Sequence, residues 1–398
     1  MLSGKTVVLG VSGSIAAYKI ADLASMLVKQ HADVHVVMTE NATHFIHPIT
    51  FETLTHNPCL TDTFDRSCPQ EVTHIALAER ADVCLLAPAS ANILGKLANG
   101  IADDMLSTTC LAMKCPVLVA PAMNVNMYEH PAVQHNLQTL KARGVEVIEP
   151  DSGYLACGAV GKGKLPGVQV LLDHILRAAA KKKDLSGKRV LITAGPTRES
   201  IDPVRFISNH STGKMGYAVA KMAALRGAAV TLVSGPVSLA PPPFVEVVGV
   251  TSAQEMFEAV ERRYEEMDII IKTAAVADYT PVQTQHEKMK KKDGEGISIP
   301  LRRTVDILQW LGAHKREGQL LCGFSMETQD VLENSRLKLH RKNADLIAAN
   351  SIRDAGSGFG TDTNHLILIT RDGTVDLPLL SKEEAADRLL DELLGLRG

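Results

Sequence analysis

Short, strongly apolar segments alternate with longer segments of helical periodicity, and this alternation constrains the fold more than any other feature. In the first half it predicts strands at Thr6–Val11, Asp33–Met38, Asp82–Ala87, Pro116–Ala120 and Val145–Ile148. It predicts helices at Ile15–Gln30, Val72–Ala81, Ala91–Leu97, Ala132–Arg143 and Val168–Ala179. Strands that alternate with helices indicate the α/β class, with a parallel sheet covered by helices on both faces.

The pattern stops at a polar run, residues 180–184, and begins again at a second turn that feeds a buried strand. The second half predicts strands at Arg189–Thr193, Ala229–Ser234, Asp268–Thr273, Leu320–Gly323, Leu346–Ala349 and His365–Thr370. It predicts helices at Met215–Arg226, Ala253–Met267, Val331–Lys342 and Lys382–Leu394. At about 150 residues per domain, 398 residues fit two three-layer parallel-sheet domains. We expect a flavodoxin-like or Rossmann-like domain over residues 1–182 and a Rossmann-like domain over residues 183–398.

Composition narrows the classes of partner. The 42 Lys and Arg against 45 Asp and Glu leave a net charge of −3, which gives no electrostatic support for a nucleic-acid partner. The apolar run at Thr6–Val11 is too short for a signal peptide or a membrane span, so we expect no membrane partner and a cytoplasmic location. The seven cysteines are scattered without C-x-x-C spacing, which argues against a disulfide framework.

A turn rich in glycine and hydroxyl groups follows the first predicted strand. Its residues Ser12, Gly13, Ser14 and Ile15 open a helix, where free backbone N–H groups and the helix dipole favour an anion. The turn lacks the third glycine of G-x-G-x-x-G, so it suits a single terminal phosphate, such as that of FMN, better than a dinucleotide.

Polar residues also follow the next three strands. Thr39 comes after the second, Ser90 and Asn92 after the third, and Asn124 after the fourth. Ligands of open parallel sheets bind at the carboxyl ends of the strands, so these residues are expected around one crevice. Helix capping is an equally good explanation for Ser90 and Asn92 taken alone.

A glycine-rich loop at residues 153–165 carries a thiol, Cys157. It nearly matches a P-loop, but Leu165 replaces the metal-binding hydroxyl and no buried strand precedes it, so we reject that interpretation. We interpret the loop as a flap whose thiol exchanges a proton. His74, at the start of a predicted helix, is by itself more often structural than catalytic.

The second half has its own candidate site. Residues 211–216 open a helix with small and hydroxyl side chains, which predicts a second anion site. Asp278 follows a buried strand, where binding of a ribose or a metal and capping of a helix are equally good explanations. The charged segment Pro281–Ile299 has two open interpretations: a solvated charge run, or a lid whose lysines close on phosphates.

Taken in order, these motifs resemble the flavin-dependent cysteine decarboxylases. They are His74 before a helix, Pro-Ala-Ser-Ala-Asn at 88–92, Pro-Ala-Met-Asn-x-x-Met at 121–127 and Ala-Cys-Gly-x-x-Gly-x-Gly at 156–163. The second half resembles the phosphopantothenate–cysteine ligase that is fused to such a decarboxylase in bacterial coenzyme A synthesis. The resemblance covers the whole chain.

The resemblance implies an FMN-dependent reaction in the first domain. In this family FMN oxidises the thiol of phosphopantothenoylcysteine, so that the neighbouring carboxylate can leave, and then returns the electrons. By similarity Cys157 is the proton donor, His74 a catalytic residue at the flavin, and Asn124 the residue that holds the substrate carboxylate. The predicted FMN-binding residues are Ser12, Gly13, Ser14, Ile15, Thr39, Ser90 and Asn92.

For the second domain the resemblance implies that CTP activates phosphopantothenate as an acyl-cytidylate, which the amine of cysteine attacks. Asn209 matches the residue that converts this intermediate, and Lys288 matches a lid lysine that offsets phosphate charge. The other matching CTP contacts are Ala274, Asp278, Val305, Asp306, Ile307, Leu308, Phe324, Lys338 and Lys342. Magnesium is expected with CTP, with no ligands identifiable in the sequence.

The chain departs from the family pattern at several positions. Ile93 stands where Thr is common, Tyr128 where Trp is usual, and Lys164 where Arg is usual, which removes a bidentate fork. Thr304-Val305 replaces Asn-Pro before Asp306, so the turn loses the fixed φ of proline.

Two alternatives remain open. One is a flavin decarboxylase for another thiol or peptide, with a degenerate second domain. The other is an FMN-binding sensor or scaffold without catalysis. Family likeness also implies a homo-oligomer, with trimeric contacts of the decarboxylase, dimeric contacts of the ligase and possibly a dodecamer.

Overall fold

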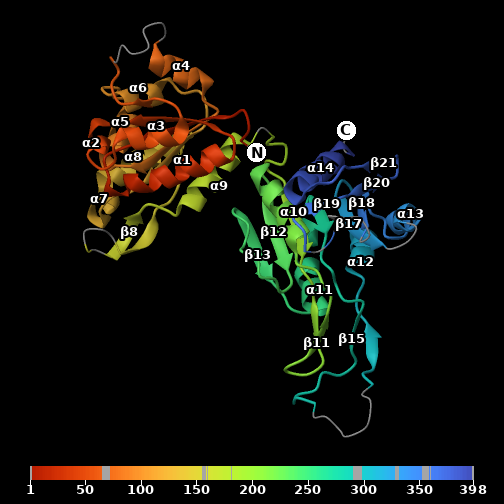
Figure 1. Cartoon of the computed structure of the whole chain (residues 1–398). Helices are drawn as coiled ribbons and strands as arrows, with labels where there is room; N and C mark the ends of the chain where they lie inside the picture. Colours follow the sequence, from red (N-terminus) through yellow and green to blue (C-terminus); the bar gives the residue numbers. More distant parts are fainter. Residues whose placement is uncertain are drawn as a thin grey trace. The chain divides into compact units, whose positions relative to one another are not determined.

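The computed structural model describes residues 2–396 except 65–71, 155–157, 159, 181, 290–297, 328–330, 352–357 and 359. The chain divides into two compact units, Met1–Lys181 and Lys182–Gly398 (Figure 1). Each unit has a sheet covered by helices, which confirms the predicted α/β class. None of the described helices combines the length and the hydrophobicity needed to cross a bilayer.

The first unit is built on a six-stranded parallel sheet with the order β3-β2-β1-β4-β5-β6. Its strands are β1 (Thr6–Val11), β2 (Asp33–Met38), β3 (Cys59–Leu60), β4 (Val83–Ala89), β5 (Val117–Pro121) and β6 (Glu146–Val147). Every residue of β4 is buried, as expected for a central parallel strand covered on both faces.

Helices cover both faces of this sheet. They are α1 (Lys19–Lys29), α2 (Glu40–Thr43), α3 (Pro48–Thr55), α4 (Thr73–Arg80), α5 (Ala91–Asn99), α6 (Met105–Ala112), α7 (Val125–Glu129), α8 (Pro131–Ala142) and α9 (Val168–Ala179). On one face α1 contacts α3 and α9. On the other face α4, α5, α6 and α8 contribute to a core that includes Leu86, Ile93, Leu106 and Leu137.

Two local features differ from the sequence-based expectation. The predicted helix Ile15–Gln30 begins with a separate 3-10 turn, Ile15–Tyr18, before α1. The glycine-rich tract expected to be a loop contains an antiparallel ribbon of β7 (Asp151–Tyr154) and β8 (Val160–Lys164). Glycines hide strand periodicity in a sequence, and the pairing partner that makes this ribbon is visible only in three dimensions.

The second unit contains an eight-stranded sheet with the order β13-β12-β9-β14-β17-β18-β20-β21. Its strands are β9 (Arg189–Ala194), β12 (Ala229–Ser234), β13 (Val245–Gly249), β14 (Ile269–Lys272), β17 (Leu320–Glu327), β18 (Leu346–Ser351), β20 (Ile367–Thr370) and β21 (Thr374–Asp376). The last two strands are joined by antiparallel pairings, β18 with β20 and β20 with β21, where we expected a wholly parallel sheet. The described part of the connection from β18 to β20 contains no crossover helix, so β20 returns antiparallel.

The helices of the second unit are α10 (Lys214–Leu225), α11 (Ala253–Glu261), α12 (Ile307–His314), α13 (Val331–Arg341) and α14 (Lys382–Gly395). On one face α11, α12 and α13 share a core that includes Met256, Leu308, Leu339 and Ile347. On the other face α10 contacts β9, β12 and α14. Two short strands, β19 (Thr363–Asn364) and β22 (Leu380–Ser381), pair beside α14.

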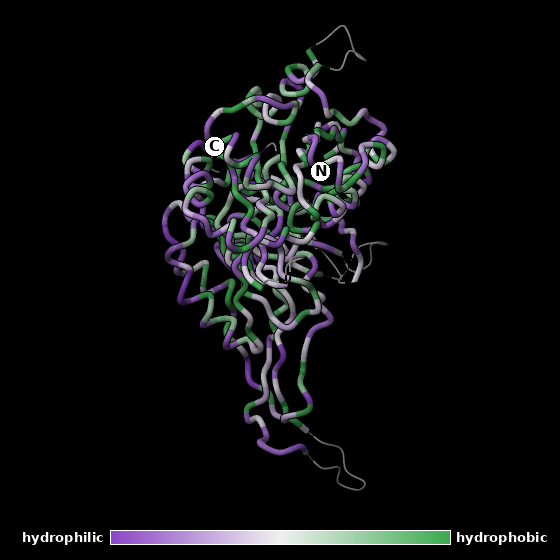
Figure 2. The backbone as a smooth tube through the Cα atoms, turned by 90° about the vertical axis from the view of Figure 1, so that its left-hand side faces the viewer, coloured by the Kyte–Doolittle hydropathy of each residue, from purple (hydrophilic) through white to green (hydrophobic). Residues whose placement is uncertain are grey.

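Two short ribbons extend from the second unit as an arm. One joins β10 (Arg198–Ser200) to β11 (Phe206–Ser208), and the other joins β15 (Tyr279–Pro281) to β16 (Leu301–Arg303). The ribbons lie side by side in both views, and Thr284 Oγ1 donates to the carbonyl oxygen of Ser200 at 3.1 Å (Figures 1 and 2). The charged segment Pro281–Ile299 therefore begins and ends on this arm, although residues 290–297 lie outside the described part.

Candidate active sites

The first unit has a pocket of about 450 Å³ where β1, β4 and β5 end. Among the residues predicted to bind FMN, Gly13, Ser14, Ile15 and Ser90 line it, together with Asn124. The other lining residues are Ala16, Tyr18, Lys19, Ala91, Ala122, Met123, Met127, Tyr154, Gly163, Lys164 and Leu165. Strand ends far apart in the sequence thus meet at one crevice, because the strands are parallel and end at the same edge of the sheet.

Ser12 holds two of these strand ends together. Its Oγ donates to the carbonyl oxygen of Pro88 at 2.7 Å and accepts from the N–H of Ser90 at 2.9 Å. Ser12 is buried and lies outside the pocket lining. Next to it, a side chain at Gly13 would bring Cβ within 2.8 Å of Cβ of Asn41. The Ser12 hydroxyl therefore fixes the position of this turn, and Gly13 allows its close approach to Asn41.

The hydroxyl of Thr39 is buried, and no described residue hydrogen-bonds to it. The backbone of Thr39 is held in place, since its N–H donates to the carbonyl oxygen of Val11 at 3.0 Å. A buried polar group without a partner costs about 1–3 kcal/mol. Thr39 lies outside the pocket lining, and its orphaned hydroxyl at the end of β2 can bond to a bound group with hydrogen-bonding atoms, such as a flavin ribityl or phosphate.

The other predicted residues of the first unit do not all lie at the pocket. Ser90 does both of the jobs considered for it, because it lines the pocket and its Oγ caps α5 by accepting from the N–H of Ile93 at 3.5 Å. Asn92 is exposed in the first turn of α5 and lies outside the lining. His74 lies on α4 and is also outside the lining that one chain provides. Cys157 falls outside the described residues.

The ribbon of β7 and β8 forms one wall of this pocket through Tyr154, Gly163 and Lys164. The N–H of Met123 donates to the carbonyl oxygen of Gly163 at 3.0 Å. Gly163 has a φ of +144°, and a Cβ there would lie 2.3 Å from the carbonyl oxygen of Met123. Only glycine allows this approach, which places Lys164 in the pocket wall beside Asn124.

The departures from the family pattern have local explanations. Ile93 is 1% exposed in the core, where an apolar side chain packs well. Tyr128 is also in the core, and its hydroxyl donates to Oε2 of Glu149 at 3.1 Å. Two hydrogen bonds of Thr304 hold the turn that lacks the proline. Its N–H donates to the carbonyl oxygen of Asp278 at 3.0 Å, and its Oγ1 donates to the carbonyl oxygen of Ala277 at 2.6 Å.

The second unit has a cavity of about 600 Å³ between β14, β17 and the helices α12 and α13. It is lined by these predicted CTP contacts: Asp278, Val305, Asp306, Ile307, Leu308, Phe324, Lys338 and Lys342. Lys338 lies on α13 and Lys342 just after it, four residues further along the chain, and both line the one cavity.

The cations in this cavity are held by specific partners. Lys342 Nζ donates to Asp306 Oδ2 at 2.5 Å and to Gln309 Oε1 at 2.9 Å. Lys338 Nζ donates to the carbonyl oxygen of Phe324 at 3.0 Å. Burial raises the pKa of Asp306, but the bonds from Lys342 and from the N–H of Gln309, together with the charges of Lys342 and Lys272, outweigh burial and lower that pKa.

Sequence reasoning missed Arg303, Arg341 and Lys272 among the cations that line this cavity, and Lys272 lies at the end of β14. Its Nζ donates to the carbonyl oxygen of Ala274 at 3.1 Å. Burial, reinforced by the charge of Lys338, lowers the pKa of Lys272 to about 8. The signal in the sequence was a lysine directly after the apolar run 269–271. It stands at the carboxyl end of a buried parallel strand, which is where ligands of such sheets bind.

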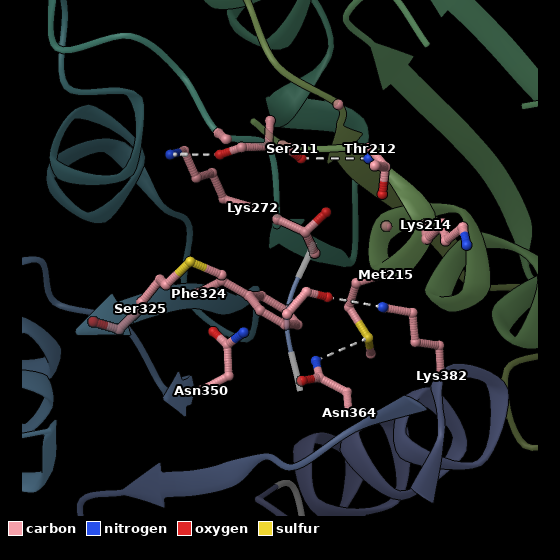
Figure 3. Close-up of a pocket in the computed structure, with 18 of the residues that line it drawn as sticks. Ser211, Thr212, Lys214, Met215, Lys272, Phe324, Ser325, Asn350, Asn364 and Lys382 are labelled. Carbon is pink, nitrogen blue, oxygen red and sulfur yellow. Dashed lines mark hydrogen bonds between the residues drawn. The ribbon is translucent and has the colours of Figure 1, made fainter. Parts of the chain in front are cut away.

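A second cavity, of about 190 Å³, lies at the N-terminus of α10 (Figure 3). It is lined by Ser211, Thr212, Lys214, Asn350 and Lys382, among others. The residues Lys272, Val276 and Phe324 line both cavities, which makes them neighbours. The predicted Ala274 lines the smaller one. The helix N-terminus and three lysines, Lys214, Lys272 and Lys382, make this cavity suitable for an anion, which is the kind of site expected from the hydroxyl-rich sequence at 211–216.

The two remaining predicted residues lie outside both linings. Asn209 is exposed, and its Nδ2 donates to the carbonyl oxygen of Ala275, a residue that lines the smaller cavity. Lys288 is exposed on the arm. The arm is fixed next to it, since the N–H of Met289 donates to Oδ2 of Asp202 at 3.1 Å. The hydrogen-bonded ion pair between Asp202 and Arg205 holds the pKa of Asp202 well below the usual range of an aspartate.

Comparison with known proteins places this architecture. A Flavoprotein family model matches residues 1–180, and the model of the DNA/pantothenate metabolism flavoprotein C-terminal domain matches residues 185–396. The coenzyme A biosynthesis bifunctional protein CoaBC of Bacillus subtilis is 52% identical over 100% of this chain and 98% of its own length. The chain belongs to the bifunctional coenzyme A biosynthesis protein family.

Two further similar proteins are a full-length relative and a solved structure of one domain. The CoaBC protein of Escherichia coli strain K12 is 45% identical over 99% of this chain and 97% of its own. A crystal structure of the C-terminal domain of a CoaBC protein is 48% identical, covers 54% of this chain and 97% of that domain, and has a TM-score of 0.46. The resemblance found in the sequence is thus confirmed, and this family member is a flavoprotein with decarboxylase and ligase domains. Its described residues contain no group of three or more His, Cys, Asp or Glu side chains that could hold a metal.

Proposed function

We propose that the chain makes phosphopantetheine in two steps, using CTP in residues 183–398 and FMN in residues 1–182. The ligase domain joins phosphopantothenate to cysteine through an acyl-cytidylate, and the decarboxylase domain then removes the cysteine carboxylate. The observation that carries this proposal is the larger cavity, where Lys272, Lys338 and Lys342 gather around a space suited to a nucleoside triphosphate.

In the ligase domain the three ammonium groups neutralise the triphosphate and stabilise charge that develops as pyrophosphate leaves. The neighbouring cavity at the N-terminus of α10 receives the phosphorylated acid, since it offers an anion site that adjoins the nucleotide cavity. Asn209 lies beside Ala275 at this junction and acts on the acyl intermediate, while Lys288 approaches the phosphates from the arm. Magnesium accompanies CTP, without a protein cage that we can name.

In the decarboxylase domain FMN is held by Gly13, Ser14, Ile15 and Ser90, which line the pocket, whereas the predicted contacts Ser12, Thr39 and Asn92 lie outside that lining. The orphaned hydroxyl of Thr39 and the narrow turn at Gly13 fit this cofactor. When bound, FMN supplies a two-electron oxidation of the substrate thiol and its reversal. Asn124 orients the carboxylate that leaves, Cys157 donates the proton to the product, and the ribbon that carries Lys164 covers the substrate.

His74 requires a second chain in this proposal. It lies on α4, outside the pocket lining of its own chain, so we assign it to the pocket of a neighbouring copy. A homo-oligomer with trimeric decarboxylase contacts and dimeric ligase contacts, up to a dodecamer, provides such a copy. The enzyme works in the cytoplasm, on small molecules, without a nucleic-acid or membrane partner.

Two assays test the proposal on the purified full-length chain. The first measures pyrophosphate release with CTP, cysteine and phosphopantothenate, with ATP in place of CTP as the comparison. The second measures carbon dioxide release from phosphopantothenoylcysteine, with the absorbance of bound flavin recorded on the same sample. Cys157→Ser should release carbon dioxide yet fail to give the final reduced product. A yellow protein with neither activity would favour a flavin-binding scaffold instead.

A further inference from the structure

The β7–β8 ribbon has little to hold it in position by itself. Its residues are mostly exposed, and two strands without an apolar core are marginally stable in water. Yet Tyr154, Gly163 and Lys164 of this ribbon form a wall of the pocket in the first unit. The position of that wall must therefore come from contacts with the body of the unit.

Those contacts meet at one carboxylate, Glu149, which lies between β6 and β7. Its Oε2 accepts from Lys162 Nζ of β8 at 2.7 Å and from the hydroxyl of Tyr128 at 3.1 Å. Its Oε1 accepts from Lys141 Nζ of α8 at 2.9 Å. Glu149 thus joins the ribbon to α7 through one oxygen, Oε2, and to α8 through the other, Oε1.

Lys162 lies between two glycines, Gly161 and Gly163, at which the ribbon packs closely against residues 123–125. A Cβ at Gly161 would lie 2.7 Å from Cγ2 of Val125, and one at Gly163 would lie 2.3 Å from the carbonyl oxygen of Met123. Lys162 Nζ also lies 5.5 Å from the centre of the Tyr128 ring, within range of a cation–π contact. The bond from Lys162 to Glu149 therefore holds β8 close to residues 123–125, which include Asn124.

The charges favour the same arrangement. The bond from Lys162, followed by that from Lys141, lowers the pKa of Glu149 to about 2, so its carboxylate is ionised at neutral pH. Burial and the neighbouring Glu149 raise the pKa of Tyr128, so its hydroxyl keeps the proton that it donates. The three donors are thus matched to one permanent acceptor.

We propose that Glu149 is a positioning residue of the decarboxylase, which pins the β7–β8 ribbon over residues 123–125 and so aligns Lys164 with Asn124. The proposal rests on the proposed function of this pocket. Glu149 acts through Lys162 and Tyr128 and does not itself line the pocket. Its removal should loosen the ribbon while the sheet of the first unit stays intact.

Hydrogen exchange on the full-length flavin-loaded chain tests this directly. In Glu149→Ala we expect amides at 121–127 and 160–165 to exchange about tenfold faster, with exchange in β1 and β4 unchanged. Lys162→Met should give the same acceleration, and the double variant should add nothing further, because both changes remove one interaction. The matched control is Lys141→Met, which removes the donor on α8 and leaves the bonds of Glu149 to Lys162 and Tyr128 in place.

Kinetics provide a second readout. Glu149→Ala should raise KM for phosphopantothenoylcysteine about fivefold and change kcat less than about twofold, with flavin content unchanged. Unaltered ribbon exchange in Glu149→Ala would overturn the proposal, as would equal acceleration in Lys141→Met. If the unaltered chain released no carbon dioxide while the exchange results held, the proposed function would fail and the anchoring role of Glu149 in the ribbon would stand.

Discussion

Lys342, which follows α13, and Asp306, at the N-terminus of α12, form an ion pair in the larger cavity of the second unit, with Nζ 2.5 Å from Oδ2. The Lys342 side chain is 5% exposed, whereas that of Asp306 is 51% exposed. The carboxylate therefore holds a buried ammonium in the cavity and remains accessible to an incoming ligand. This ion pair therefore joins the start of α12 to the end of α13, the two helices that border the cavity.

Replacing this carboxylate should weaken the ligase. In Asp306→Asn we expect a loss of about 1–2 kcal/mol in the free energy of unfolding of the second unit, since Lys342 keeps only a neutral partner. CTP-dependent pyrophosphate release should fall, and flavin binding should not change. Denaturant unfolding and the pyrophosphate assay measure these effects. Asp376→Asn is the control, because that carboxylate is 68% exposed and its loss should cost less than about 0.5 kcal/mol.

Lys272 should make the second unit sensitive to alkaline pH. Burial lowers its pKa in the folded protein to about 8, below the usual 10.5, so the unfolded chain binds more protons between these values. The free energy of unfolding should therefore rise as pH increases from about 8 to 10.5, and this contribution should be lost as pH falls through 8. Unfolding curves of Lys272→Met should lack the rise, whereas Lys188→Met should keep it.

The same titration should affect nucleotide binding in the opposite direction. Lys272 loses its positive charge as pH rises through about 8, so CTP affinity should fall over that range. Calorimetry with CTP across this range measures the effect. Affinity that changes equally with pH in Lys272→Met would assign the effect to another group.

Thr39 and Ser12 should respond in opposite ways to loss of a hydroxyl. The Thr39 hydroxyl is buried with no described partner, so Thr39→Val should leave the flavin-free protein equally stable or about 1 kcal/mol more stable. Flavin affinity should fall about tenfold, because one hydrogen bond to the cofactor is lost. Ser12→Ala removes two bonds that are present without ligand and should cost about 1–2 kcal/mol. Thermal unfolding with and without FMN distinguishes the two variants.

Asn209 should matter after the nucleotide reaction and not before it. Its Nδ2 already bonds to the carbonyl oxygen of Ala275, which fixes the amide at the edge of the smaller cavity. Asn209→Ala should release pyrophosphate from CTP but form little cysteine adduct. Rapid-quench analysis should detect the accumulated acyl-cytidylate. Normal adduct formation would remove Asn209 from the proposed mechanism.

Much of the fold was predictable because buried parallel strands leave a local signal. The run from Val83 to Ala87 is apolar on both faces, and the structure buries the whole of β4. The β7–β8 ribbon gave no such signal, because its glycines have no preference for a strand without the opposite strand. The antiparallel return of β20 was missed for a similar reason, since strand direction depends on the connection and not on the strand itself.

Site residues were likewise predictable where the sequence carries a local signal and were missed where it does not. Ser14, Asn124 and Asp306 follow or open elements whose ends the sequence marks, and each lines a cavity. His74 does not, because α4 carries it away from the pocket of its own chain. Lys272 was missed, because a lysine after an apolar run gains meaning only when Lys338 and Lys342 are seen beside it.

The sequence by itself determined the α/β class and the polar chemistry at the strand ends, since both follow from local periodicity and residue type. The tertiary structure alone decided which groups share a cavity, which hydroxyl lacks a partner, and which carboxylate anchors the ribbon. Burial and partner geometry set these properties: the lowered pKa of Lys272 and the three donors around Glu149 come from residues distant in the chain.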